Sequence, residues 1–176
     1  GSLVKRLVVG LLAGSLVLML LPGVAAAKSP NDQATGSGQI EALYGENAAF
    51  SFSAKSGPNG EDAKGNLNLR RTVGYTELNG KAEVHCLFVV GNEAVIRGEF
   101  KGDPDSWPFG PGFSYSIVYV QDNGQPNGEV ADMGVAYGVT GGDCESWLGW
   151  SRLSAKPLLK GNAVVTHRGA HQVGQP

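Results

Sequence analysis

The sequence has few of the residues that carry most enzyme chemistry. Its 176 residues include two cysteines and three histidines, and Asp, Glu, Lys and Arg together make up 17%. It contains no Gly-x-Ser-x-Gly nucleophile elbow, no His-Glu-x-x-His zinc motif and no phosphate-binding glycine-rich loop. These absences exclude the common hydrolase, metalloprotease and nucleotide-binding signatures. We therefore predict no catalytic residues and no enzymatic activity.

Long hydrophobic runs are also absent, except near the N-terminus. Lys5 and Arg6 precede an apolar run over residues 7–21, and three alanines follow at 25–27. This order of basic, apolar and small residues is typical of a secretory signal peptide. The run is short for a membrane span, and no cysteine at the cleavage site offers a lipid attachment. We predict a signal peptide over 1–27, a secreted mature protein, and no membrane contact once the signal is removed.

Positive charge is scarce in the rest of the chain. The signal segment contains two of the 14 basic residues and none of the 16 acidic ones, so the remainder has a formal net charge of −4. Nucleic acids and anionic membranes favour a basic partner surface. We therefore expect no nucleic acid as a partner.

The two cysteines, Cys86 and Cys144, are expected to form a disulfide. In an oxidising compartment a single pair most simply forms a bridge. The bridge would close a loop of 57 intervening residues. In the chain-entropy model it would stabilise the fold by roughly 3–4 kcal/mol. The alternative is two free thiols, one of them reactive.

Glycine is abundant, with 27 residues, but it has no triplet period, which excludes collagen. Between the glycines, short segments alternate apolar and polar residues, as half-buried strands do. Apart from a helical turn within 145–154, no segment has the pattern of a capped amphipathic helix. The pattern predicts an all-β fold, an antiparallel β-sandwich or a small β-barrel of about eight strands. The expected strands lie within 49–54, 65–70, 82–90, 94–100, 113–120, 133–139 and 158–166.

These segments predict one domain over 36–166. A polar segment at 28–35 is expected to be a flexible lead-in, and 167–176 a disordered tail. Because alternate residues of a strand face the same side, Val84, Cys86 and Phe88 are expected to share a face. If the sheet closes as a barrel, its inward face should surround a ligand cavity. That face would contain Phe50, Phe52, Val84, Phe88, Ile96, Tyr115, Ile117 and Tyr119.

Several short, glycine-rich motifs follow one another in the chain. They are GSGQI (36–40), FSFSAK (50–55), GNLNL (65–69), VHCL (84–87), VGNEAVIRG (90–98), VQDNGQP (120–126) and GNAVV (161–165). Their order resembles small β domains of secreted bacterial proteins, called post-COAP-like domains. The resemblance covers about 36–165 and implies a β-sandwich-like module without catalytic residues. Such domains are often appended to larger extracellular proteins, whereas this one is expected to stand alone and has a long loop at 143–156 with two tryptophans.

One loop carries the hard oxygen ligands that calcium prefers. Asp122 and Asn123 lie in it, and Asp132 follows. The spacing differs from that of an EF-hand, but the three residues predict a candidate calcium site. The alternative is a hairpin end in which Asp122 makes an Asx-turn and Gly124 adopts a positive φ. No other cofactor is predicted.

Two loops are rich in aromatic residues. Trp107 and Phe109 lie in a Pro/Gly-rich loop, and Trp147 and Trp150 lie in a second. Exposed aromatic rings stack on sugars or fill partner pockets. The alternative is that these rings close the ends of the fold and fill its core, since tryptophan is usually highly buried.

Together these patterns predict a secreted, non-enzymatic β domain for binding, adhesion or structural support at the cell exterior. The two aromatic loops would form its binding surface, and the partner would be an extracellular protein, a glycan or another copy of the chain. The alternative is a β-barrel that binds a small apolar ligand. A third interpretation is an enzyme of unrecognised type, for which the sequence offers no matched nucleophile and base.

Overall fold

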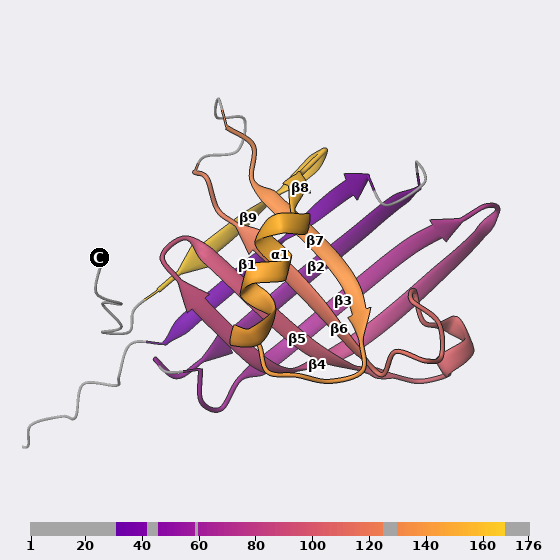
Figure 1. Ribbon diagram of the computed structural model, residues 1–176, viewed down its shortest axis with the longest axis horizontal. Helices are drawn as coiled ribbons and strands as arrows, with labels where there is room; N and C mark the ends of the chain where they lie inside the picture. Colours follow the sequence, from indigo (N-terminus) through magenta and orange to yellow (C-terminus); the bar gives the residue numbers. More distant parts are fainter. Residues whose placement is uncertain (1–30, 42–45, 59, 125–129, 168–176) are drawn as a thin grey trace, which may run out of the picture.

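A computed structural model describes residues 31–41, 46–58, 60–124 and 130–167 (Figure 1). The predicted signal peptide and most of the predicted tail lie outside these residues. The described strands form a nine-stranded antiparallel sheet in the order β8-β7-β6-β5-β4-β3-β2-β1-β9, which curls into a half-barrel. The all-β fold predicted from the sequence is therefore confirmed, as a curled sheet.

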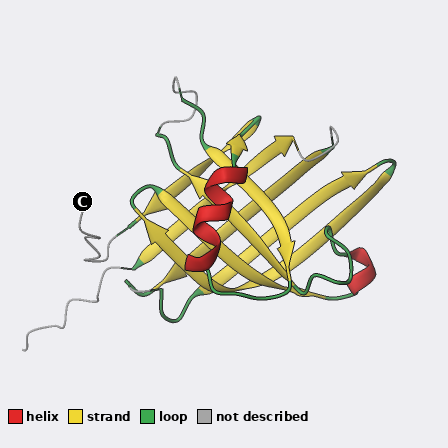
Figure 2. Cartoon of the chain, in the orientation of Figure 1, coloured by secondary structure: helices red, strands yellow, loops and turns green. Residues whose placement is uncertain are grey.

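Most strands pair with their neighbours in the chain, whereas β9 returns to pair with β1. The strands are β1 (Asp32–Glu41), β2 (Asn47–Ser56), β3 (Lys64–Val73), β4 (Thr76–Val90), β5 (Glu93–Lys101), β6 (Tyr115–Gln121), β7 (Met133–Val139), β8 (Lys156–Pro157) and β9 (Lys160–Thr166). The described helices are the 3-10 helices η2 (Pro104–Ser106) and η3 (Glu145–Trp147) and the α-helix α1 (Leu148–Ser154) (Figure 2). The helical turn expected within 145–154 is thus confirmed. No helix in the described part of the chain is long and apolar enough to cross a membrane.

The first strand, β1, is not among the strands expected from the sequence, the first of which lies within 49–54. Residues 32–35, expected to belong to a flexible lead-in, are part of β1 and pair with β2, and from Gln33 onward also with β9. Ala34 is fully buried in the core. Pairing on both edges outweighs the low strand propensity of this polar segment.

A β-bulge in β4 changes which side chains face the interior. Val84 pairs with Gly98 and Cys86 with Arg97, so His85 is an extra residue. Before the bulge, Val84 belongs to the interior cluster. After it, Leu87 and Val89 take the interior positions, and Cys86 and Phe88 lie on the outer face. The expectation that Val84, Cys86 and Phe88 share a face is therefore wrong, because the inserted residue shifts the two-residue period.

Side chains fill the interior of the half-barrel. The Phe50 ring of β2 reaches β1 and β7: a methyl group at Gly38 would lie 2.6 Å from Phe50 Cζ, and one at Gly134 would lie 3.0 Å from it. Glycine at these positions makes room for the ring. Of the residues expected to line an internal cavity, Phe50, Phe52, Val84 and Ile96 belong to this packed cluster. Such packing argues against a ligand cavity at the centre.

A second apolar cluster lies on the outer face of the sheet, beneath α1. The other residues expected to face inward, namely Phe88, Tyr115, Ile117 and Tyr119, belong to this outer cluster. In β6 the inward positions are taken by Val118 and Val120 instead. Because β6 is covered on both faces, its residues 117–120 form an unbroken apolar run, and a two-residue alternation could not identify which of them face inward.

Candidate functional site

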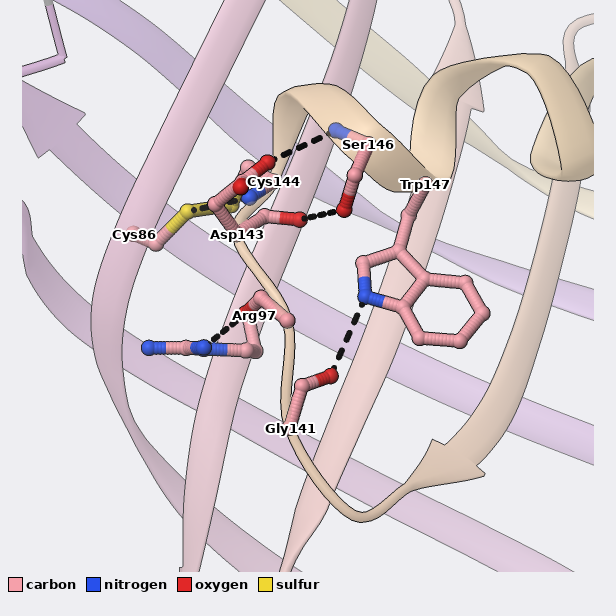
Figure 3. Close-up of a disulfide and its surroundings, with 8 residues drawn as sticks. Cys86, Arg97, Gly141, Asp143, Cys144, Ser146 and Trp147 are labelled. Carbon is pink, nitrogen blue, oxygen red and sulfur yellow. Dashed lines mark hydrogen bonds between the residues drawn. A yellow bond between two sulfur atoms is a disulfide. The ribbon is translucent and has the colours of Figure 1, made fainter.

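A disulfide joins β4 to the segment that precedes α1 (Figure 3). The Cα atoms of Cys86 and Cys144 are 6.0 Å apart, and Cys144 is almost fully buried. The predicted pairing is therefore confirmed. A disulfide favours an oxidising compartment. The bridge also places the aromatic segment that follows Cys144 against the sheet.

Hydrogen bonds order the turn after the disulfide (Figure 3). The Ser146 N–H donates to Asp143 Oδ1 at 2.8 Å, and this bond lowers the pKa of the Asp143 carboxyl. Trp147 Nε1 donates to the carbonyl of Gly141 at 3.2 Å. The Trp147 ring packs edge-on against Tyr137, with centroids 5.7 Å apart. Trp147 therefore supports the base of α1, and its ring is only partly accessible.

The other end of α1 is held by an ion pair. Arg152 Nε lies 2.8 Å from Glu93 Oε1, and the Tyr119 hydroxyl donates to the same carboxylate. The hydrogen bond from Arg152 holds the pKa of Glu93 below its usual range. Burial, together with the bond to Glu93, raises the pKa of Tyr119. The disulfide and this pair fix α1 at both ends, which gives its exposed side chains a defined position.

The aromatic residues predicted to form a surface have different environments. Trp107 is only 8% exposed and stacks on Phe100 with centroids 5.4 Å apart. The expectation of an exposed ring at Trp107 is therefore wrong, because η2 folds the loop back onto the core. Phe109 packs partly buried against the same core. Trp150, on α1, is 61% exposed.

Phe109 and Trp150 both line a groove of about 360 Å³, which we call the seam groove. In β7 only Met133 and Gly134 pair with β8, so the strand beyond Gly134 has no described partner on that side. The groove lies along this free stretch. Its lining residues are Ile40, Glu41, Ala48, Arg71, Phe109, Val135, Ala136, Tyr137, Trp150, Ser154 and Lys156.

The seam groove is mainly apolar with a few polar groups. Ile40 and Ala48 are buried residues of its lining, and Trp150 is its most exposed ring. The Arg71 guanidinium lies 2.9 Å from the Glu46 carboxylate. Tyr137 shares a hydrogen bond of 2.7 Å with Ser151. Sites for small molecules have this composition and volumes of about 300–1,000 Å³.

Most residues of the seam groove have no signature in the sequence. Its residues come from β1, β2, β3, β7, β8, α1 and the loop after η2, so no local motif identifies them. Phe109 and Trp150 could be singled out only because exposed aromatic residues in loops are unusual.

The acidic residues proposed for calcium do come together, but their oxygens accept backbone N–H groups. Asp132 accepts from Asn123 at 2.8 Å and from Ala163 at 2.7 Å. Asp122 accepts from Gly124 at 3.0 Å, as an Asx-turn does, and from Val165 at 3.1 Å. Across the described ranges, no cluster of three or more His, Cys, Asp or Glu residues could hold a metal. The geometry accounts for both aspartates structurally, and calcium binding stays an untested prediction.

Comparison of the chain with models of known protein families, with curated proteins and with solved structures finds no match.

Proposed function

We propose that this protein is an extracellular binding module that holds a small, mainly apolar ligand in the seam groove. The observation that carries the proposal is the convergence of Phe109, Tyr137 and Trp150 on one concave site of about 360 Å³. The predicted signal peptide and the disulfide support a location outside the cell. The resemblance to post-COAP-like domains is compatible with such a role and remains a prediction.

The lining of the groove suggests the chemistry of its ligand. Ile40, Ala48 and Ala136 offer aliphatic surface, and the Trp150 indole offers a flat face on which a ring can stack. Lys156 at the same groove offers a cationic donor to a polar end of the ligand, and Arg71, which is paired with Glu46, offers its remaining N–H groups. We therefore expect an apolar or aromatic body with one polar or anionic group.

Titration of the oxidised mature protein with the dye 1-anilinonaphthalene-8-sulfonate tests the groove, because the dye combines an aromatic body with an anionic group. We expect fluorescence to rise on binding and the affinity to fall at least tenfold in Trp150→Ala. Leu153→Ala is the matched control, because Leu153 lies on the same helix, is 85% exposed and does not line the groove. Equal loss in both variants, or no binding by the wild type, would contradict the proposal.

Native mass spectrometry of the protein secreted by its own host would look for the natural ligand. A small-molecule adduct that survives gentle desalting and disappears in Trp150→Ala would support the seam groove as its site. An adduct that persists in Trp150→Ala would place the ligand elsewhere. If the oxidised protein from the host has no adduct and the dye does not bind, adhesion or structural support would be favoured instead.

A further inference from the structure

The outer face of β1–β3 and of the first half of β4 is polar, and no described segment covers it. The segment containing α1 packs over β4–β7, and in the described part of the chain no helix covers β1–β3 (Figure 2). The strand register aligns outward side chains in rows that cross several strands. One row contains Thr35, Ser53, Asn66 and Glu83, and the next contains Ser37, Ser51, Asn68 and Lys81. We call this surface the polar face.

Two hollows run together along the polar face. One has a volume of about 740 Å³ and the other of about 960 Å³, and they share Asn68, Lys81 and Lys101. Short side chains such as Ser51 and Ser53, Gly65 and several lysines line these hollows. The result is a continuous trough across several strands, which suits an extended chain better than one compact molecule.

The trough is basic, although the protein as a whole is acidic. Its lining includes five basic residues, Lys55, Lys64, Arg70, Lys81 and Lys101, and two acidic ones, Glu83 and Asp103. The whole chain has a formal net charge of −2. This asymmetry indicates a partner with negative charge.

Three of the lysines take part in no ion pair among the described residues. Lys101 pairs with Glu99 at 3.1 Å and with Glu83 at 3.6 Å. In contrast, no ion pair among the described residues involves Lys55, Lys64 or Lys81, and all three are exposed. These ammonium groups are therefore available to anionic groups of a ligand.

We propose that the polar face binds an extended anionic polysaccharide. The lysines would pair with its carboxylates or sulfates, and Ser51, Asn66 and Asn68 offer donors and acceptors for sugar hydroxyls. The trough has no exposed aromatic or large aliphatic side chain. Protein interfaces, membranes and single-stranded nucleic acids usually require such anchors. This site is separate from the seam groove and does not depend on it.

Affinity electrophoresis of the mature protein tests this proposal, in native gels that contain polygalacturonate, dextran sulfate or neutral dextran. We expect an acidic polysaccharide to retard the protein and neutral dextran not to. Stronger retardation by polygalacturonate would indicate a carboxylated ligand, and stronger retardation by dextran sulfate would indicate a sulfated one. The double variant Lys64→Ala/Lys81→Ala should bind at least tenfold more weakly. The single variants Lys81→Ala and Lys160→Ala form the matched pair, because each removes one positive charge but Lys160 does not line the trough; Lys160→Ala should bind like the wild type.

A second variant separates sugar recognition from charge alone. Asn68 lies at the junction of the two hollows, with its Nδ2 3.3 Å from Ser51 Oγ. Asn68→Leu keeps the charge but removes the amide, and it should also weaken binding severalfold, whereas Trp150→Ala should not. Equal retardation of Lys81→Ala and Lys160→Ala would overturn the proposal. Equally strong binding to neutral dextran or to double-stranded DNA would overturn it as well.

Discussion

Asp132 binds the backbone of Ala163. Its Oδ2 accepts the Ala163 N–H at 2.7 Å, while its Oδ1 accepts the Asn123 N–H at 2.8 Å. Asp132 directly precedes β7 and Ala163 lies in β9, two strands that do not pair in the sheet. One carboxylate thus joins segments at the two edges of the half-barrel where no strand ladder exists. Its side chain acts as a substitute for strand pairing.

Asp132→Ala should therefore destabilise the fold. Asp132 is only 7% exposed, and its removal leaves two backbone N–H groups without their acceptor. Hydrogen bonds to a charged group contribute about 1.5–3 kcal/mol each, so we expect a loss of about 3 kcal/mol in the free energy of unfolding. Urea unfolding would measure it. Asp105→Ala, at an exposed position in η2, is the control and should change little; equal stability of the two variants would refute the role of Asp132.

Loss of the disulfide should lower the melting temperature by several degrees. The bridge closes a loop with a sequence separation of 58 residues, which corresponds to roughly 3–4 kcal/mol in the chain-entropy model. A thermal melt of the wild type with and without reductant would measure the effect. The double variant Cys86→Ala/Cys144→Ala should melt at the temperature of the reduced wild type and should not respond to reductant. An unchanged wild-type melt on full reduction would contradict this expectation.

The Glu93–Arg152 pair should make stability depend on pH in the acidic range. The pKa of Glu93 is lowered from its ordinary value of 4.5 in the folded state, mainly by the hydrogen bond from Arg152. A carboxyl with a lowered pKa stabilises the fold above its unfolded pKa, and this contribution is lost as the pH falls through the folded pKa. The difference in stability between wild type and Glu93→Gln should therefore be largest above pH 4.5 and shrink steadily as the pH falls below it. Denaturant unfolding between pH 3 and about 7 would test this; a constant difference would show that the charge of Glu93 does not matter.

Two tryptophans should respond in opposite ways to truncation. Trp107 is buried and stacked on Phe100, so Trp107→Ala should cost about 3–5 kcal/mol of unfolding free energy. Trp150 is mostly exposed, so Trp150→Ala should change stability by about 0.5 kcal/mol or less. Chemical unfolding would compare them. Because Trp107 Nε1 has no hydrogen-bond partner among the described residues, Trp107→Phe should cost less than Trp107→Ala.

Local patterns in the sequence predicted much of the fold. Alternation in residues such as Phe50 and Phe52 indicated half-buried strands, since a strand with one covered face must alternate. The sequence also predicted the partner of Cys86, because a single pair of cysteines leaves one choice. It could not predict the faces of β4 and β6. The bulge at His85 shifts the alternation of inward and outward residues within β4. In β6 both faces are covered, so apolar residues do not alternate with polar ones and do not reveal which face is inward.

The candidate sites were even less accessible to sequence analysis. The sequence by itself determined most of the strand segments, though not β1, together with the disulfide and the helical turn at 145–154, because these depend on neighbouring residues or on a unique pair. Only the tertiary structure decided the curl of the sheet, the roles of Asp122 and Asp132, and the convergence of Phe109 and Trp150 at the seam groove. These features depend on contacts between residues far apart in the chain, whose distances are set by strand order and register rather than by any local pattern.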